Sequence, residues 1–385
     1  MQFQRRSSSH ELAALTLTET IQFSLNTLSR PAYVIYLDAK SAYDRVLWQF
    51  LIRNLYQLGI KDQGLLLIDQ RLKNRRTVCE WNRTLMGPIR DECGVEQGGI
   101  NSADYYKVYN NEQLELAQNS NFGVPLGPVT ISGIGQADDV ALISNDIYAL
   151  QGLLDLSLYY CQKYHVGLST EKTKLQVFSC KSTDIEAFYA RTISPINIDN
   201  LRIPFVEQAE HVGTIRSVHG NLPHLQSRFT AHRKALFAIL PVGLARAHRG
   251  NPAASLRAHQ TYVIPALLSG VTTLVLKKSE TDLLDQYVKK TLLNLQKLMP
   301  RTPSCVIMFL AGHLPGAAHL HLKQLTIFGM ICRLEESSLH KIADHLLTSA
   351  KSSSGSWFLQ IRQLCLQYHL PTPLALLHHP PTKAQ

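Results

Sequence analysis

The placement of three aspartates constrains the fold of this chain most strongly. Residues 32–37 (AYVIYL) are β-branched and aromatic, which is typical of a buried strand, and Asp38 follows immediately. Residues 129–144 have the pattern of a hairpin whose turn carries Asp138 and Asp139. If these strands are neighbours in one sheet, the three carboxylates meet at its edge. Such a cluster repels itself unless it is protonated or neutralised by hard cations, and carboxylate oxygens suit Mg²⁺.

This arrangement favours phosphoryl transfer. Two such ions, roughly 4 Å apart, activate a 3′-hydroxyl and stabilise a departing pyrophosphate. Each aspartate also has an ordinary explanation when taken singly, because Asp-Asp suits a solvated turn and Asp38 is a suitable helix cap. The combination is more specific than either of its parts.

The remaining pattern is mixed in the first half of the chain and helical in the second. Helices are predicted over residues 8–27, 46–58, 63–72, 101–118 and 147–164, and further strands over 77–81, 87–92, 175–178 and 201–206. From residue 221 onward apolar residues recur every three or four positions, which predicts helices alone. The pattern predicts an α+β half followed by an all-helical half.

Charge divides the chain in the same way. The sequence holds 39 Lys and Arg against 29 Asp and Glu, a net charge of +10. Residues 1–200 carry 19 basic and 21 acidic side chains, whereas residues 201–385 carry 20 and 8. The second half is therefore the expected contact surface for a polyanion. The basic residues expected to contact phosphates, unless they form ordinary solvated helix faces, are Arg228, Arg233, Lys234, Lys277 and Lys278.

Other classes of protein are disfavoured. No apolar run approaches the roughly 18 residues that span a bilayer, so no membrane partner is expected. Seven scattered cysteines argue against a disulfide framework and a structural zinc site. His313, His319 and His321 have a spacing that could bind a metal, but no cysteine or carboxylate lies nearby in the sequence, so we expect structural histidines.

Four short segments match one family in order. Residues 37–46 (LDAKSAYDRV) closely resemble the first catalytic motif of the reverse transcriptases of non-LTR (LINE-like) retrotransposons. The second, third and fourth motifs are similar to residues 94–102 (GVEQGGINS), 136–142 (QADDVAL) and 168–175 (LSTEKTKL). The resemblance extends over about residues 8–335.

The resemblance implies an α+β right-hand polymerase palm, an antiparallel sheet flanked by helices, followed by a helical thumb. The expected divisions are a partial palm over residues 1–215, a thumb over 216–300, a post-thumb helical region over 301–350 and a flexible tail over 351–385. The implied activity is RNA-directed DNA synthesis. The implied partners are an RNA template, a DNA primer or target and deoxynucleoside triphosphates, in the cytoplasm and nucleus.

The same resemblance assigns roles to the acidic residues and to a lysine. Asp38 and Asp138 would hold two Mg²⁺ ions, with Mn²⁺ as an alternative, and Asp139 would be the supporting acid. Lys172 would be the proton donor or charge partner of the departing pyrophosphate, although an ordinary exposed lysine is an equal reading.

It also implies a nucleotide-binding group. Tyr43 would lie beneath the sugar of the incoming nucleotide and exclude a 2′-hydroxyl, unless it is a core aromatic beside Trp48. Gln97, Gly98 and Gly99 would let the backbone approach the nucleotide and template closely.

Departures from the family pattern leave alternatives open. Gln136 replaces the usual aromatic residue of the third motif, and Ala103 replaces the usual proline of the second. The fingers that clamp the triphosphate, and the endonuclease, have no counterpart, so we expect a truncated copy that binds nucleic acid but polymerises poorly alone. The rival readings are a catalytically inactive remnant or co-opted RNA-binding module and, less favoured, a group II intron reverse transcriptase.

Overall fold

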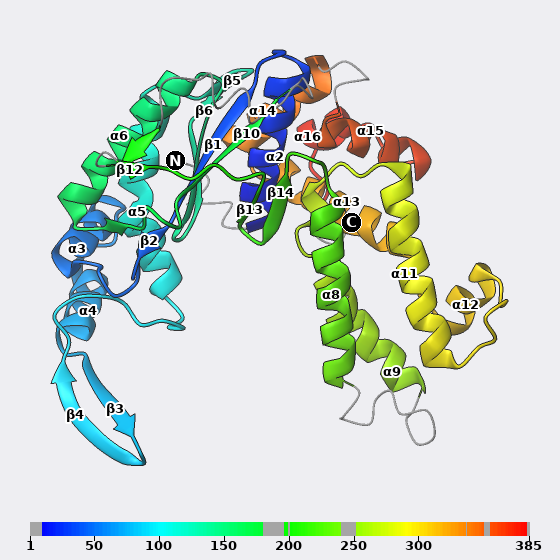
Figure 1. The fold of residues 1–385 in the computed structure, drawn as a ribbon, viewed down its shortest axis with the longest axis horizontal. Coiled ribbons are helices and arrows are strands. Elements are labelled where there is room, and N and C mark those ends of the chain that lie inside the picture. The colour runs from blue at the N-terminus through cyan, green and yellow to red at the C-terminus, as the bar shows by residue number, and fades with distance from the viewer. Residues whose placement is uncertain are drawn as a thin grey trace. The chain divides into compact units, whose positions relative to one another are not determined.

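The chain forms two compact units. A computed structural model describes residues 10–179, 196–198, 201–239, 252–335, 337–349 and 355–382 (Figure 1). The first unit comprises the described residues of Arg30–Leu126 and Thr130–Val206, and the second those of Ser9–Ser29, Gly127–Val129 and Glu207–Gln385.

A four-stranded antiparallel sheet organises the first unit. Its strand order is β10 (Lys174–Phe178), β1 (Ala32–Leu37), β8 (Asp139–Ser144) and β7 (Gly133–Gln136). All six residues of the central strand β1 are buried, which explains its β-branched and aromatic composition. The predicted neighbourhood of β1 and the hairpin β7–β8 is confirmed.

Helices and short ribbons complete this unit. Its other elements are β2 (Ala39–Lys40), α3 (Trp48–Gln57), α4 (Asp62–Lys73), β3 (Arg76–Trp81), β4 (Thr84–Arg90), α5 (Ser102–Asn119), β5 (Val124–Leu126), β6 (Val129–Ile131), α6 (Ile147–Tyr164), β9 (Gly167–Leu168), β11 (Asn197–Ile198) and β12 (Leu201–Arg202). One face of β1 packs through Tyr33, Ile35 and Leu37 in a core that includes residues of α5 and α6.

The strand expected over residues 201–206 is shorter than predicted. Residues 204–206 still lie beside β10, where the N–H of Leu175 donates to the carbonyl oxygen of Pro204 at 3.0 Å and the N–H of Val206 donates to that of Leu175 at 2.9 Å. Only β12 is extended, and it pairs with β11 instead of joining the main sheet. Pro204 follows two residues later and has no N–H to donate to a ladder, so the strand ends early. Phe205 makes a single bridge with Leu175 of β10.

The second unit is almost entirely helical. Its elements are α2 (His10–Asn26), β13 (Gln208–His211), β14 (Thr214–Ser217), α8 (Leu222–Ile239), α9 (Pro252–Ala258), a π-helical turn (His259–Val263), α10 (Ile264–Leu268), a 3₁₀ turn (Val271–Thr273), α11 (Lys278–Gln296), α12 (Ser304–Ala311), α13 (Gly316–Cys332), α14 (Ser338–Ser349), α15 (Trp357–Gln367) and α16 (Pro373–His378). No single described helix is long and apolar enough to cross a bilayer, although α12 and α13, bent by 58° at their junction, reach that length and composition together.

The two compact units divide the chain differently from the palm expected over residues 1–215. The helix α2 and the hairpin β13–β14 belong to the second unit. The buried guanidinium of Arg216 donates hydrogen bonds to the carbonyl oxygen of Ala14, at 2.8 Å, and to the hydroxyl of Thr18, at 3.3 Å. These contacts tie β14 to α2 within the helical unit.

The flexible tail expected over residues 351–385 is also corrected. Its described part, residues 355–382, contains α15 and α16, and the side chain of Trp357 is fully buried. The backbone N–H of Trp357 donates to the carboxylate of Glu19 in α2, at 2.8 Å, and its indole N–H donates to the carbonyl oxygen of Thr272, at 2.8 Å. Burial of a large aromatic side chain holds this segment in place.

Four buried histidines form a hydrogen-bonded row in the second unit. The Nε2 atoms of His232 and His259 are 3.4 Å apart, Nδ1 of His259 is 3.2 Å from Nε2 of His313, and Nδ1 of His313 is 3.0 Å from Nε2 of His319. The nitrogens pair one with another along the row instead of converging on one point. The expectation of structural histidines therefore agrees with the geometry, and His321 bonds to the hydroxyl of Tyr368 instead.

These histidines make the second unit sensitive to acid. Burial lowers the pKa of His232 to about 4, of His259 to about 3 and of His319 to about 4. The folded state keeps them neutral, whereas the unfolded chain binds protons below about pH 6.5. Their contribution to stability is therefore complete above about pH 6.5 and is lost as the pH falls toward 4.

Buried Glu19 acts in the opposite direction. Burial raises its pKa to about 7, so its contribution is present at low pH and is lost as the pH rises toward 7, which offsets one histidine. Urea unfolding followed by circular dichroism should show a net loss of stability between about pH 6.5 and pH 5. A free energy of unfolding that stays constant over that range would contradict this account.

Candidate active site

The sheet places the aspartates at one edge. Leu37, the last residue of β1, is paired with Val140 of the antiparallel strand β8. Asp38, which follows Leu37, therefore lies beside Asp139, which precedes Val140. Asp138 lies in the two-residue turn between β7 and β8, whose other member, Ala137, has φ 56°. The turn is the tight hairpin that the sequence predicts.

The segment around Lys172 also positions the backbone of Asp38, a role that the sequence did not predict. The backbone N–H of Ser169 donates to the carbonyl oxygen of Asp38, at 2.8 Å, and the backbone N–H of Asp38 donates to the hydroxyl of Thr173, at 3.3 Å. Ser169 and Thr173 are both buried. The only sequence feature that could have indicated this role is the presence of Ser169 and Thr173 on either side of Lys172, in a segment otherwise rich in charged residues.

Lys172 reaches the acidic edge. Its ammonium nitrogen lies 3.9 Å from a carboxylate oxygen of Asp38, and the two side chains are 73% and 40% exposed. An ion pair with this exposure contributes little to stability. It does show that a cation is accommodated beside Asp38.

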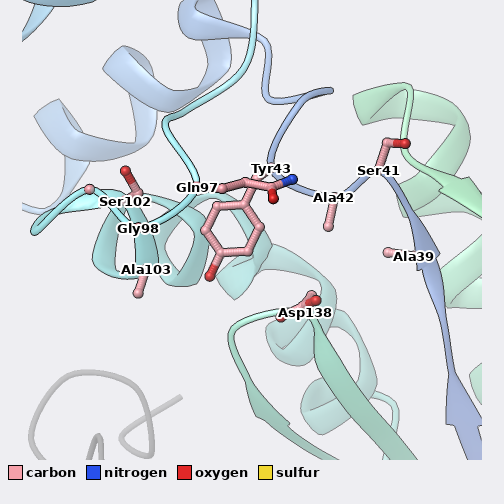
Figure 2. A pocket seen from close by; sticks show the side chains of 10 residues that line it. Ala39, Ser41, Ala42, Tyr43, Gln97, Gly98, Ser102, Ala103 and Asp138 are labelled. Atoms are coloured by element: carbon pink, nitrogen blue, oxygen red, sulfur yellow. The ribbon is translucent and has the colours of Figure 1, made fainter.

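An open cavity of about 490 Å³ lies next to this edge. Its volume is in the range of small-molecule sites, roughly 300–1,000 Å³. Figure 2 shows three separate segments lining it: the turn after β2, the Gly-rich loop with the start of α5, and the β7–β8 turn. The lining residues are Ala39, Ser41, Ala42, Tyr43, Gln97, Gly98, Gly99, Ser102, Ala103 and Asp138.

Tyr43 is both a packing residue and a cavity residue. Its ring stacks on that of Tyr106, with centroids 5.2 Å apart and planes 18° from parallel. Partial burial, and then the negative charges of Asp138 and Asp139, raise the pKa of Tyr43 above its usual value. The phenol is therefore neutral at physiological pH. Figure 2 shows the ring in the cavity, with Asp138 nearby.

The Gly-rich loop brings backbone to the cavity. Gly98 has φ +83°, a left-handed conformation that side-chain-bearing residues rarely adopt. Gln97, Gly98 and Gly99 all line the cavity, as do the first residues of α5, Ser102 and Ala103. A helix N-terminus presents free backbone N–H groups and favours anions. The cavity therefore has an anion-attracting wall as well as the carboxylate of Asp138.

The carboxylates fit a hard cation but do not form the tight cluster that we expected. In the part of the chain that the structure describes, no three His, Cys, Asp or Glu side chains lie close enough to hold one metal ion. Asp38 and Asp138 instead offer carboxylate oxygens singly at the same edge. Mg²⁺ commonly takes one or two protein carboxylates and completes its shell with waters and substrate phosphates.

The basic residues expected to bind nucleic acid all lie in the second unit. Arg233 and Lys234 are exposed on α8, and Arg228 of the same helix is half-buried beside the hydroxyl of Ser227. Lys277 and Lys278 are exposed at the start of α11, where an ion pair at 2.9 Å with Asp282 raises the pKa of Lys278.

Comparison with known proteins supplies the family. Residues 2–211 match the reverse transcriptase (RNA-dependent DNA polymerase) family, and no curated protein matches the chain. Similar solved structures include apo telomerase from Candida tropicalis (13% identity, TM-score 0.42), with 92% of this chain and 57% of that chain covered. Another is telomerase from Candida albicans in complex with a TWJ fragment of telomeric RNA (11% identity, TM-score 0.40, 92% and 53% covered).

The chain thus spans somewhat more than half the length of these two structures. Reverse transcriptases bind an RNA template and generally use divalent metal ions. The family match includes β1, the β7–β8 turn and every residue that lines the cavity, and it covers more than half of the 385 residues. The chain belongs to the reverse transcriptase (RNA-dependent DNA polymerase) family.

Proposed function

We propose that the cavity of the first unit binds a deoxynucleoside triphosphate and a primer 3′-end for RNA-templated DNA synthesis, in a protein of a non-LTR retrotransposon. The observation that carries this proposal is the meeting of three motif segments, distant in the sequence, around one cavity. The order of the four motifs and the residues within them support the retrotransposon origin. The cavity has a carboxylate on one side and a helix N-terminus on another, which suits a metal-bound triphosphate.

Asp38 and Asp138 are the proposed metal ligands, with Asp139 as the supporting acid. Bound Mg²⁺, or Mn²⁺ in its place, would activate the primer hydroxyl and stabilise the leaving pyrophosphate. Ser169 and Thr173 fix the backbone of Asp38 through hydrogen bonds at 2.8 and 3.3 Å. Because its own ammonium is exposed and already beside Asp38, Lys172 is the proposed donor of a proton or positive charge to the pyrophosphate.

The remaining assignments concern orientation and nucleic-acid binding. Gln97, Gly98 and Gly99 would bring backbone against the nucleotide and template. In the second unit, residues 216–300 are proposed as the thumb and 301–350 as the post-thumb region. Its phosphate-binding residues would be Arg228, Arg233, Lys234, Lys277 and Lys278.

Primer extension on an RNA template tests the proposal. The chain, joined to any coding sequence that lies upstream of Met1, should extend an annealed DNA primer with deoxynucleotides only when a divalent cation is present. RNA binding without any synthesis would instead indicate the inactive remnant or co-opted RNA-binding module.

Tyr43 should select the sugar. Tyr43→Ala removes a ring that lines the cavity, so ribonucleotide incorporation should rise relative to deoxynucleotide incorporation, by about tenfold if the exclusion contributes about 1.4 kcal/mol. Tyr43→Phe keeps the ring and should keep the wild-type ratio. The measurement is the ratio of kcat/KM values for the two nucleotides. An unchanged ratio in a folded Tyr43→Ala protein would reduce Tyr43 to its packing on Tyr106.

A further inference from the structure

The hairpin β3–β4 exposes apolar surface that the first unit does not cover. Every residue of both strands is exposed, and Trp81 and Leu85 are 71% and 72% exposed. Figure 1 shows the hairpin extending away beyond the end of α4. An isolated two-stranded hairpin is only marginally stable in water, and exposed apolar patches mark interaction sites. The hairpin is therefore built to contact something else.

Its two faces differ. Residues paired across the strands share a face, and the faces alternate along β3. In β4 the register shifts between the partners of Thr77 and Cys79, which brings Met86 and Ile89 to the same face. The pairs Thr77–Ile89, Cys79–Met86 and Trp81–Thr84 therefore lie on one face, which we call the Trp81 face. The pairs Arg76–Arg90 and Glu80–Leu85 lie on the other. The Trp81 face carries no charge, and Met86 and Ile89 extend it with side chains 57% and 58% exposed.

The hairpin also carries basic side chains. Residues 71–90 hold six basic residues and one acidic residue, Glu80, but Arg71, Lys73 and Arg75 form ion pairs with Glu96, Asp69 and Asp91. The positive charge that the hairpin offers to a partner therefore comes from Arg76, Arg83 and Arg90. Arg83 lies at the tip of the hairpin, next to the Trp81 face. Exposed aromatic rings within a basic groove or ribbon are how proteins bind single-stranded nucleic acid, because bases stack on the rings and the charges follow the phosphates. An exposed indole flanked by arginines favours nucleic acid as the partner, because the ring suits a base and the guanidinium groups suit phosphates.

The base of the hairpin is tied to the cavity. Arg75 forms an ion pair with Asp91, at 2.5 Å, and donates to the carbonyl oxygens of Gly94, at 3.1 Å, and Cys93, at 3.0 Å. Val95, which follows Gly94, donates its backbone N–H to the carbonyl oxygen of the cavity residue Tyr43, at 2.8 Å. The segment that leaves the hairpin thus runs directly along the cavity wall.

We propose that the Trp81 face of the β3–β4 hairpin binds the single-stranded RNA template outside the cavity, with the Trp81 indole stacked on a base. This inference rests on the proposed function, since it supplies the template with a path outside the catalytic cavity. It adds a template-binding surface of Trp81, Met86 and Ile89 to the motif residues, with Arg83 contacting phosphate.

Binding to a DNA primer annealed to RNA, with or without a single-stranded RNA overhang, tests the proposal. Stacking on an aromatic ring contributes roughly 1–3 kcal/mol per base, so Trp81→Ala should weaken binding of the overhang substrate on the order of tenfold or more and leave the blunt duplex unaffected. Leu85→Ala removes an equally exposed side chain from the other face and is the matched control, with affinity unchanged. Arg83→Gln should reduce the slope of log K against log[salt] by about the amount that one phosphate contact contributes.

Fluorescence gives a second readout, which does not depend on catalysis. Of the three tryptophans, Trp357 is buried and Trp48 is half-buried, so quenching on addition of single-stranded RNA should come from Trp81. Trp81→Phe should retain binding and lose the quenching. The proposal would be overturned if Trp81→Ala lost affinity equally for the overhang substrate and the blunt duplex, or lost affinity for neither. It would also be overturned if the only effect of Trp81→Ala were a loss of self-association, measured by light scattering. Absent DNA synthesis with these Trp81 effects intact would count against the proposed function alone.

Discussion

Asp138→Asn is expected to slow primer extension on an RNA template by on the order of 10³-fold or more, about 4 kcal/mol of transition-state stabilisation. Asp138 is exposed in the cavity, where its carboxylate is free to contact a metal-bound substrate. Asparagine has the same shape but lacks the charge that a hard cation requires. Asp38→Asn should have a similar effect. The measurement is the single-turnover rate at saturating Mg²⁺.

The control for this experiment is another exposed aspartate of the same unit. Asp155 lies on α6, outside the cavity lining, and hydrogen-bonds to Gln151 at 2.7 Å. Asp155→Asn should leave the rate unchanged. Equal rates in Asp138→Asn and in wild-type protein would remove Asp138 from the chemistry.

Trp357→Ala is expected to destabilise the second unit by roughly 3–5 kcal/mol, the range for truncating a buried aromatic side chain. Trp357 is fully buried, and its indole N–H is bonded to the carbonyl oxygen of Thr272. The substitution leaves a cavity and removes the shorter of two hydrogen bonds to the carbonyl oxygen of Thr272, the other coming from Gln324 at 3.4 Å. Urea unfolding followed by circular dichroism measures the loss.

Trp81→Ala is the matched control, because Trp81 is the exposed tryptophan of the chain at 71% and its removal should change stability by no more than about 0.5 kcal/mol. A loss for Trp357→Ala as small as this would show that α15 does not stabilise the unit.

Local sequence patterns predicted the part of the site that depends on neighbouring residues. The strand before Asp38 has a buried β composition, and the Asp138 turn lies between two largely apolar arms, so both could be located from short windows of sequence. The antiparallel sheet joining them followed from the resemblance. The cavity lining agrees with the first, second and third motifs through Tyr43, Gln97 and Asp138.

Contacts between distant residues could not be read from the same windows. The bond from Arg216 to the carbonyl oxygen of Ala14 spans 202 positions, and the bond from the backbone of Trp357 to Glu19 spans 338. No periodicity encodes such pairings, which place α2 with the helical unit and order the supposed tail. The tail was expected to be flexible because residues 352–356 (SSSGS) have the composition of a linker, but composition alone does not show which residues pack.

The support of Asp38 was missed for a related reason. Thr173 is bonded to the backbone of Asp38, and a backbone contact leaves little trace in the choice of side chain. The resemblance assigned a role to the charged Lys172, whereas the buried hydroxyl of its neighbour Thr173 accepts the hydrogen bond that positions Asp38. Thr173→Val should therefore be included beside the aspartate variants as a test of positioning.

The most direct test of the account maps where a divalent cation binds. Fe²⁺ in place of Mg²⁺, with ascorbate and peroxide, cleaves the backbone close to the bound ion, and mass spectrometry identifies the cuts whether or not the chain is active. The account predicts cuts around Asp38 and around Asp138, suppressed by excess Mg²⁺ and lost in the Asp38→Asn, Asp138→Asn double variant. Cuts at other places, or the same cuts in the double variant, would contradict a metal-dependent polymerase site at this edge of the sheet.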